Sequence, residues 1–220
     1  MFRTVFIGGA TAAVLAALTP AAGGAQAPAA PAPPPGKVTI DLVSVNGSGC
    51  RPGTAKVAVS PDNTAFTVTY SEYLAQVGKG AKPTDFRKNC QLGLNVHVPQ
   101  GFTYGVAKAD YRGFANLEEG AVGSQQASYY FQGMSATTTQ RSKDFIGPMQ
   151  GDWQVTHTVP YQAIVHKKCG EQRNININTQ LLVNGGWSDT DTTNSFMAMD
   201  STDGSLNTKY HFAWKKCKVR

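Results

Sequence analysis

The sequence predicts an all-β protein, an antiparallel β-sandwich of jelly-roll-like or related type that carries two disulfides. Three observations indicate this fold class. Apolar and polar residues alternate with a period of two over most of the chain, as in strands with one buried face. The 23 glycines and 12 prolines are spread along the chain and divide it into short segments, as turns do in sheet proteins. The four cysteines are even in number and widely spaced.

In the first half of the chain, the alternation predicts strands at 38–42, 57–59, 66–70, 90–98 and 102–106. The second and third of these should form a hairpin, because Ser60-Pro61-Asp62-Asn63 lies between them and proline favours the second position of a turn. Cys90 shares one face of its strand with apolar residues, so its sulfur should point inward. Helical signal is thin: only 72–77 and 114–118 could form single turns.

In the second half, strands are predicted at 129–134, 153–159, 162–169, 175–183, 194–200 and 207–217. The last two should pair as a hairpin, with Ser201-Thr202-Asp203-Gly204 as its turn. The stretch 135–151 is polar and punctuated by glycine and proline, which predicts a long loop.

The N-terminus has the features of a secretory signal peptide over residues 1–25: a basic start, an apolar run at 5–18 and a zone of small residues. Cleavage after Ala25 or Ala27 fits the small-residue rule, and we favour Ala25 because the other site would leave proline first. The apolar run is shorter than the roughly 20 residues of a spanning helix, and an uncleaved anchor is the alternative. Residues 26–36, rich in proline and alanine, predict an extended linker, which leaves 37–220 as one domain of a secreted, extracellular protein.

The cysteines of an exported chain predict disulfides, and their wide spacing argues against a metal site. They are Cys50, Cys90, Cys169 and Cys217. Three pairings are possible, and we favour Cys50–Cys90 with Cys169–Cys217, one bridge in each half. On the chain-entropy model each bridge would contribute about 4 kcal/mol.

The net charge is +6, and only 15% of the residues are charged. The basic residues are scattered apart from one group at the C-terminus: Lys215, Lys216, Lys218 and Arg220. This group could contact an anionic cell-wall polymer or lipid headgroups, but we interpret it as a solvated strand end. Nucleic acid is not an expected partner, because it would require a denser basic stripe. No further segment is expected to span a membrane.

Motifs for metal binding and nucleophilic catalysis are few. The Gly-x-Ser-x-Gly and His-Glu-x-x-His patterns are absent. The four histidines are dispersed: His97, His157, His166 and His211. Asp200 and Asp203 resemble part of a calcium loop, as does Asp189-Thr190-Asp191, but both segments lack the complete ligand pattern of an EF-hand. Calcium at Asp200 and Asp203 is therefore a hypothesis, and no other cofactor is expected.

An extracellular hydrolase that acts on a polymer is the alternative function. A glycosidase needs two carboxyl groups that face a sugar. The available carboxylates are Glu72, Asp110, Glu118, Glu119, Asp152 and Asp200. The sequence does not show which of them converge, so the catalytic residues stay unassigned.

A row of amides is the main binding signal, because planar amides both donate and accept hydrogen bonds and therefore suit sugar hydroxyls. The amides alternate with apolar residues on one strand: Asn174, Asn176, Asn178 and Gln180. The nearby aromatic residues that could stack on sugar rings are Trp153, Trp187, Tyr129 and Tyr130. A solvated outer sheet face is the other interpretation of the row. We expect a non-enzymatic module that binds an extracellular glycan or the cell envelope.

Four segments together resemble the domain of unknown function 4360 family, small exported proteins of actinobacteria and filamentous fungi. They are VNGSGCRPGTAKVAVSPDNTAFTVTYSEYLAQVG at 45–78, FRKNCQLGLNVHVPQGFTYGVAKADYRGFANL at 86–117, ASYYFQGM at 127–134 and MDSTDGSLNTKYHFAWKKC at 199–217. The resemblance covers essentially the whole mature chain. It implies export and a β-rich disulfide fold, and it brings no established activity.

Overall fold

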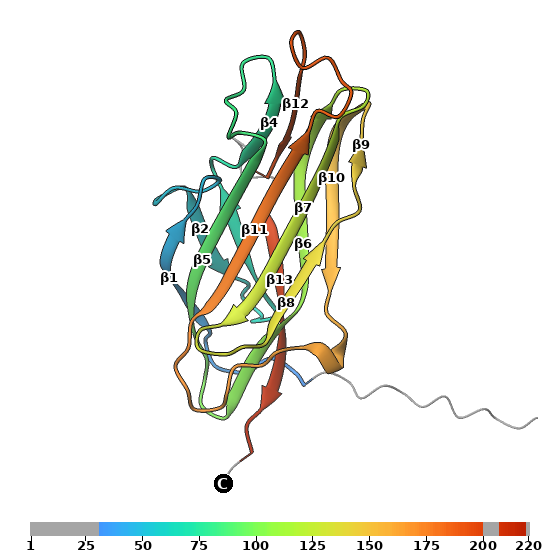
Figure 1. Cartoon of the computed structure of the whole chain (residues 1–220). Coiled ribbons are helices and arrows are strands. Elements are labelled where there is room, and N and C mark those ends of the chain that lie inside the picture. The colour runs from blue at the N-terminus through green and yellow to red at the C-terminus, as the bar shows by residue number, and fades with distance from the viewer. Residues whose placement is uncertain (1–30, 200–206, 219–220) are drawn as a thin grey trace, which may run out of the picture.

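Two stacked sheets form the protein, which is described by a computed structural model over residues 31–199 and 207–218 (Figure 1). The strands are β1 (Thr39–Asn46), β2 (Ala55–Val59), β3 (Ala65–Tyr70), β4 (Leu74–Gly78), β5 (Arg87–His97), β6 (Phe102–Leu117), β7 (Val122–Phe131), β8 (Thr137–Arg141), β9 (Phe145–Ile146), β10 (Met149–Thr158), β11 (Ile175–Asn184), β12 (Asn194–Ala198) and β13 (Thr208–Lys216). A short 3-10 turn, Tyr161–Ala163, is the only helical element in this part of the chain.

The six-stranded sheet has the order β1-β5-β11-β7-β8, with β9 beside β7. The seven-stranded sheet has the order β2-β3-β13-β6-β12-β4, with β10 along β6. Every strand pair is antiparallel. The predicted antiparallel sandwich is therefore confirmed, as are both disulfides, Cys50–Cys90 and Cys169–Cys217.

The predicted hairpin between β2 and β3 is confirmed, with Val57 opposite Val68. Its turn is closed by a hydrogen bond from Ser60 N to Ala65 O at 2.9 Å. Asn63 adopts a φ of 56° there, a left-handed conformation that asparagine tolerates better than most residues.

Several local predictions were wrong. The segments 72–77 and 114–118 are not helical turns, since they belong to β4 and the end of β6. The stretch 135–151 contains β8, β9 and the start of β10 in place of a long loop. The segments 194–198 and 208–216 are strands but do not pair as a hairpin, because β12 and β13 each align with a different part of β6.

The segment 162–169 is also not a strand. It covers the outer surface of the seven-stranded sheet at Gly105, where an added Cβ would lie 2.5 Å from Val165 O. Below this point Lys167 N donates to Tyr104 O at 2.9 Å, and Thr103 Oγ1 donates to Lys167 O at 2.6 Å. The missing side chain of glycine allows residues 164–165 to approach β6 closely, and Lys167 is hydrogen-bonded to the backbone of the same strand.

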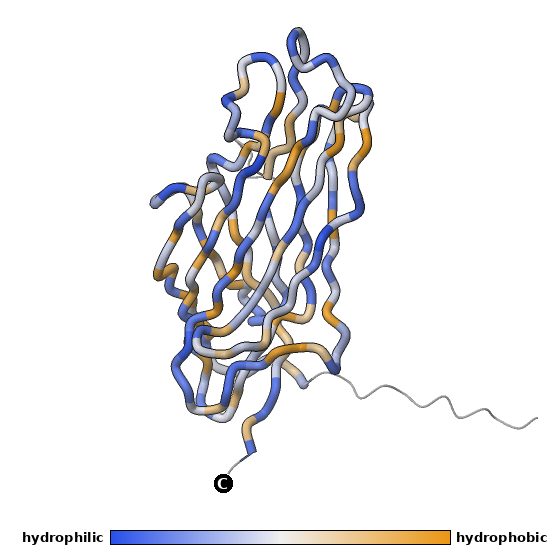
Figure 2. The backbone as a smooth tube through the Cα atoms, viewed as in Figure 1, coloured by the Kyte–Doolittle hydropathy of each residue, from blue (hydrophilic) through white to orange (hydrophobic). Residues whose placement is uncertain are grey.

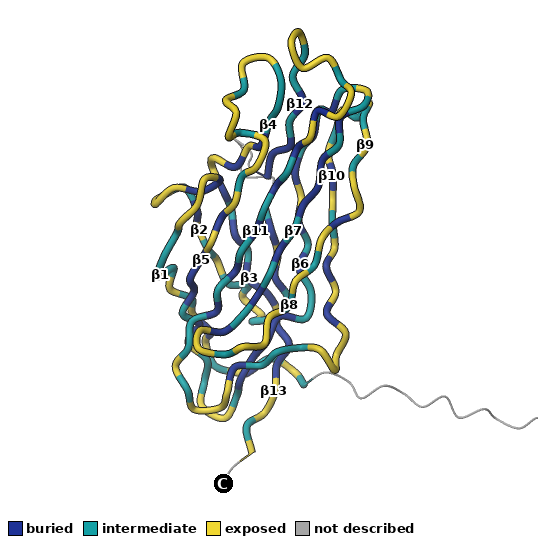
Figure 3. Tube along the Cα trace, viewed as in Figure 1, coloured by how far each residue is buried: buried dark blue, intermediate teal, exposed yellow. Residues whose placement is uncertain are grey.

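The core lies between the sheets, and residues along each strand alternate between buried and exposed positions (Figures 2 and 3). Tyrosines fill much of its centre: Tyr70, Tyr73, Tyr104, Tyr111, Tyr129 and Tyr210. The hydroxyls of Tyr111 on β6 and Tyr129 on β7 hydrogen-bond across the two sheets, and those of Tyr73 and Thr179 lie 3.1 Å apart. Burial raises the pKa of Tyr70 to about 12, so this core stays uncharged at physiological pH.

A buried histidine makes the fold sensitive to acid. His157 on β10 is 4% exposed and packs against the Tyr111 ring at 4.9 Å. Neither ring nitrogen has a hydrogen-bond partner among the described residues, and desolvation lowers its pKa from 6.5 to about 4. The unfolded chain therefore takes up this proton first as the pH falls. Stability from His157 is complete above about pH 6.5 and is lost between about pH 6.5 and 4.

We expect this loss to reach about 3 kcal/mol of the free energy of unfolding at pH 4, and His157→Leu to remove it. Urea unfolding at pH 7, 5.5 and 4 measures the free energy of unfolding of the wild type and of His157→Leu. The exposed-histidine variant His97→Gln is the control and should keep the wild-type acid loss. Burial also lowers the pKa of His166, so His157→Leu should still lose some stability in acid, but less than the wild type. An identical pH dependence in wild type and His157→Leu would contradict the prediction.

Candidate functional site

Outward-facing amides on β5, β11 and β7 form one continuous surface of the six-stranded sheet, which we call the amide face. Its amide side chains are Asn89, Gln91, Asn95, Gln126, Asn176, Asn178 and Gln180. Three of the four predicted amides belong to it, because β11 alternates strictly between buried and half-buried positions from Ile175 onward. The fourth, Asn174, precedes β11, and its carbonyl oxygen accepts a hydrogen bond from Gln132 N at 2.9 Å.

The strand register brings these side chains into transverse rows. Asn178 lies opposite Gln91 on β5 and Ser128 on β7, and Asn176 lies opposite Tyr130 on β7. Gln91 Nε2 donates to the Tyr130 hydroxyl at 3.4 Å, which places a half-buried aromatic ring within the amide rows. Asn178 Oδ1 is buried and has no hydrogen-bond partner among the described residues.

The amide face is nearly uncharged. Charged residues stand at its margins. Arg87 Nε donates to Gln180 Oε1 at 2.6 Å, and His97 Nε2 lies 2.7 Å from Asp41 Oδ2. On β8, Arg141 lies opposite Gln126 and is paired with Asp144 at 2.6 Å. Among the outward positions of the described strands of this sheet, Asp41 is the single carboxylate. A pair of carboxyl groups that could cleave a glycosidic bond is therefore not found on the described part of this face.

The two predicted tryptophans do not lie together. Trp153, on β10 in the other sheet, is 3% exposed and packs against Phe145 with ring centroids 5.6 Å apart. It therefore belongs to the core and has no ring surface for a sugar. Trp187 is 73% exposed and follows the end of β11, close to Gly120. The structure thus leaves Trp187 available and corrects the expectation for Trp153.

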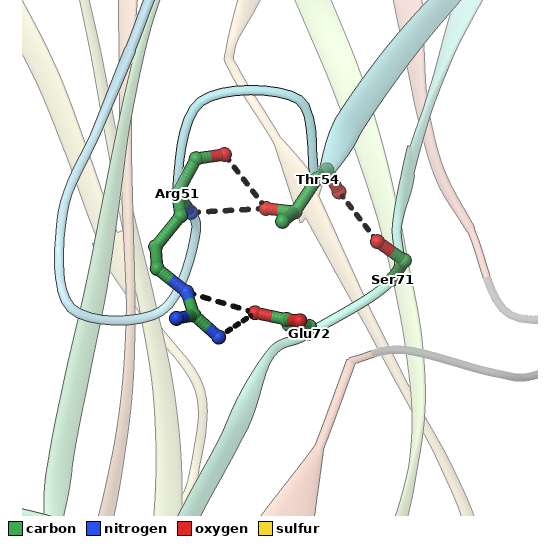
Figure 4. A network of polar contacts seen from close by, with 4 residues as sticks. All are labelled: Arg51, Thr54, Ser71 and Glu72. Atoms are coloured by element: carbon green, nitrogen blue, oxygen red, sulfur yellow. Dashed lines mark hydrogen bonds and ion pairs between the residues drawn. The ribbon is translucent and has the colours of Figure 1, made fainter.

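Among the candidate carboxylates, Glu72 is held in an exposed ion pair. Figure 4 shows that both Arg51 Nε and Arg51 Nη2 donate to Glu72 Oε2, at 3.0 and 2.5 Å. Thr54 and Ser71 complete this network through backbone atoms of the adjoining turn. The network joins the 51–54 turn to the start of the β4 connection, and it gives Glu72 a structural role.

Asp110 lies on the outer surface of the seven-stranded sheet. Burial opposes its ionisation, but hydrogen bonds from Thr156, Lys108 and His211 outweigh this and lower the pKa of its carboxyl group. Thr156 Oγ1 donates at 2.7 Å, and His211 Nε2 lies 2.9 Å away. A general acid at neutral pH needs a raised pKa, so Asp110 does not fit the acid of a glycosidase.

The calcium hypothesis finds no support in the described part of the chain. Asp200 and Asp203 lie outside the described residues. Asp189 uses its carboxylate within its own turn, where it accepts hydrogen bonds from Asp191 N at 3.2 Å and Thr192 Oγ1 at 2.5 Å. No group of three or more acidic, histidine or cysteine side chains suited to a metal ion occurs within residues 31–199 and 207–218.

Of the two predicted stacking aromatics on β7, Tyr130 lies within the amide rows, whereas Tyr129 is 5% exposed and belongs to the core. The amides of β5 were missed as site residues. A signal for them was present, because Asn89, Gln91 and Asn95 occupy the outward phase of a strand whose inward phase was already assigned. The local pattern could not show that β5 pairs with β11, because the two strands are far apart in the sequence.

Comparisons with known proteins identify the family of the chain. Residues 36–217 match the family model described as "Domain of unknown function (DUF4360)". The chain is 36% identical over 187 residues to an "Uncharacterized secreted protein" of Arthroderma benhamiae, which covers 84% of this chain and 74% of that protein. Secretion, predicted from the N-terminus and consistent with two disulfides, is confirmed by this relative. None of the helices in the described residues is long and apolar enough to cross a membrane. The chain is a secreted member of the DUF4360 family of unknown function.

Proposed function

We propose that this secreted protein is a non-enzymatic module that binds a neutral polysaccharide of the extracellular matrix or cell envelope through the amide face. The observation that carries the proposal is the register of β5, β11 and β7. It gathers amides from three strands around the half-buried ring of Tyr130. Amides and hydroxyls offer donors and acceptors without net charge, which matches the chemistry of uncharged sugars.

The low charge of the amide face also supports this choice of ligand. A sheet face that serves only for solubility ordinarily carries lysine and glutamate, whereas the centre of this face carries amides and hydroxyls. An anionic polymer would gain little from such a surface, because the central rows carry amides and hydroxyls and no cation. The breadth of a six-stranded sheet suits an extended polymer better than a small solute, which usually binds in a concave pocket.

The test is retention of the oxidised mature protein on insoluble cellulose, chitin and β-1,3-glucan, with calcium and with chelator. Asn176→Ala combined with Asn178→Ala should weaken retention about tenfold to a hundredfold, because each lost hydrogen bond is worth about 0.5–1.5 kcal/mol. The fold should be unaffected, since both side chains face outward.

Gln150→Ala combined with Gln154→Ala is the matched control, because these exposed amides lie on β10 in the other sheet. This variant should bind like the wild type. Equal retention of the Asn176/Asn178 variant and the wild type on every polysaccharide would refute the proposal, as would failure of the wild type to bind any of them. Loss of retention in chelator would instead point to a calcium-dependent surface.

A further inference from the structure

A pocket opens at the upper end of the sandwich, between the ends of the two sheets, and we call it the end pocket. Its volume is about 650 Å³, within the range of roughly 300–1,000 Å³ typical of small-molecule sites. One wall comes from β4 of the seven-stranded sheet. The other comes from the end of β11 and from Phe86, just before β5, in the six-stranded sheet. In Figure 1 the connections from β4 to β5 and from β11 to β12 rise at this end.

The end pocket extends the core and not the outer surface of either sheet. Val77 shares its phase of β4 with Ala75, which is fully buried, and Val183 is fully buried on β11. Val183 N donates to Phe86 O at 2.8 Å, and Phe86 precedes β5 in the inward phase that contains Cys90. Phe86 is nevertheless 45% exposed, so an inward-facing aromatic side chain keeps uncovered surface at the pocket.

Hydrogen bonds hold the walls of the end pocket in place. Gln76 N donates to Asp85 O at 2.9 Å, which fixes the connection from β4 to β5 against β4. Lys79 N donates to Thr193 O at 2.7 Å, which joins this connection to the one from β11 to β12. Because these walls are formed before a ligand arrives, binding needs little loop ordering.

The lining of the end pocket is mainly apolar. Its apolar side chains are Val77, Ala81, Pro83, Phe86, Leu182 and Val183. Gln76 and Asn184 add amides, Thr190 adds a hydroxyl, and Lys82 is the one ionisable residue among those that line the pocket. A concave, apolar lining with a few polar groups is the usual form of a site for a small organic molecule.

We propose that the end pocket binds a small, neutral, mainly apolar molecule, one with an aromatic ring or a short acyl chain. The ligand class follows from the lining, because apolar side chains favour an apolar ligand body and the amides serve a few hydrogen-bonding groups. Binding covers the exposed surface of Phe86. A sugar unit would lose more here, because its hydroxyls would leave water for a mainly apolar lining. The inference is independent of polysaccharide binding, since the end pocket lies between the sheets and the amide face lies outside one of them.

The test is titration of the oxidised mature protein with N-phenyl-1-naphthylamine, a neutral apolar dye whose fluorescence rises in an apolar site. We expect saturable binding at one site per chain, with a dissociation constant of about 1–100 μM. Phe86→Ala should weaken dye binding about tenfold, and Phe86→Leu should weaken it less, because leucine restores part of the apolar surface. Tyr161→Ala is the matched control, since Tyr161 is an exposed aromatic residue outside the pocket, and it should bind like the wild type.

The end pocket and the amide face can fail separately, because Asn176→Ala combined with Asn178→Ala should leave dye binding unchanged. Absence of saturable dye binding, or wild-type affinity in Phe86→Ala, overturns the proposal. Tighter binding of 8-anilinonaphthalene-1-sulfonate, which adds a sulfonate to the same rings, would assign the pocket to an anion beside Lys82 and overturn the neutral class. Sedimentation velocity should show no dimer that Phe86→Ala dissociates, and such a dimer would assign the pocket to a second copy of the chain.

Discussion

Replacement of Cys50 and Cys90 together by alanine is expected to lower the free energy of unfolding by about 4 kcal/mol on the chain-entropy model. The bridge joins the segment after β1 to β5 across a sequence separation of 40 residues, so its loss frees a long loop in the unfolded chain. Both cysteines are 1% exposed, and the substitution therefore also removes sulfur atoms from the core. Guanidinium unfolding of the oxidised proteins, followed by far-UV circular dichroism, measures the difference.

The second bridge supplies the matched comparison. Cys169–Cys217 closes a similar separation of 48 residues, but Cys169 is exposed and Cys217 is half-buried. Chain entropy alone makes the two losses nearly equal at about 4 kcal/mol. Burial makes the Cys50/Cys90 variant the less stable of the two. A smaller loss for Cys50/Cys90 than for Cys169/Cys217 would show that sulfur burial adds nothing here.

The fold class and the inward position of Cys90 could be predicted because the signals are local. Cys90 lies in phase with Leu92 and Leu94 on β5, which placed its sulfur inside before any pairing was known. The β2–β3 hairpin has its turn residues between two short alternating runs. Each of these features depends on a few consecutive residues and on the period of two.

The partners of β12 and β13 could not be predicted in the same way. Consecutive strands separated by a turn commonly pair, but here both strands pair with β6, whose 16 residues accommodate them one after the other. The length of β6 was itself hidden, because small residues such as Gly113 and Ala115 occupy its inward phase. Small inward residues weaken the hydrophobic alternation, and the end of β6 therefore resembled a helical turn.

The site was half predictable for the same reason. The amides of β11 are consecutive in phase and were found, whereas the amide face also needs β5 and β7 beside them. Which strands neighbour each other is a property of the whole sheet, set by nonlocal packing and not by any one segment. The sequence pattern therefore identified the amides of β11, but not the neighbouring side chains of β5 and β7 that complete the surface.

The second large expected effect separates the two tryptophans that the sequence placed together. Trp153→Ala should lower the free energy of unfolding by about 3–5 kcal/mol, because it leaves a cavity under β10. Trp187→Ala should change it by less than about 0.5 kcal/mol, because its side chain is mostly in solvent. Chemical unfolding followed by far-UV circular dichroism measures both, since the signal does not depend on the tryptophan that is removed.

The packing of Trp153 against a glycine explains why a smaller side chain at this position would leave a cavity. Its ring lies directly over Gly113 of the neighbouring strand, at the place that a Cβ would occupy, so the two residues fill one space between them. Trp153 also shares its inward phase with Val155 and His157, a pattern that already indicates burial. Trp153→Phe should keep part of the packing and lose less stability than Trp153→Ala. If Trp187→Ala weakened polysaccharide binding at unchanged stability, the binding surface would include the 185–193 segment. If Trp153→Ala proved as mild as Trp187→Ala, the inward position of Trp153 would be wrong.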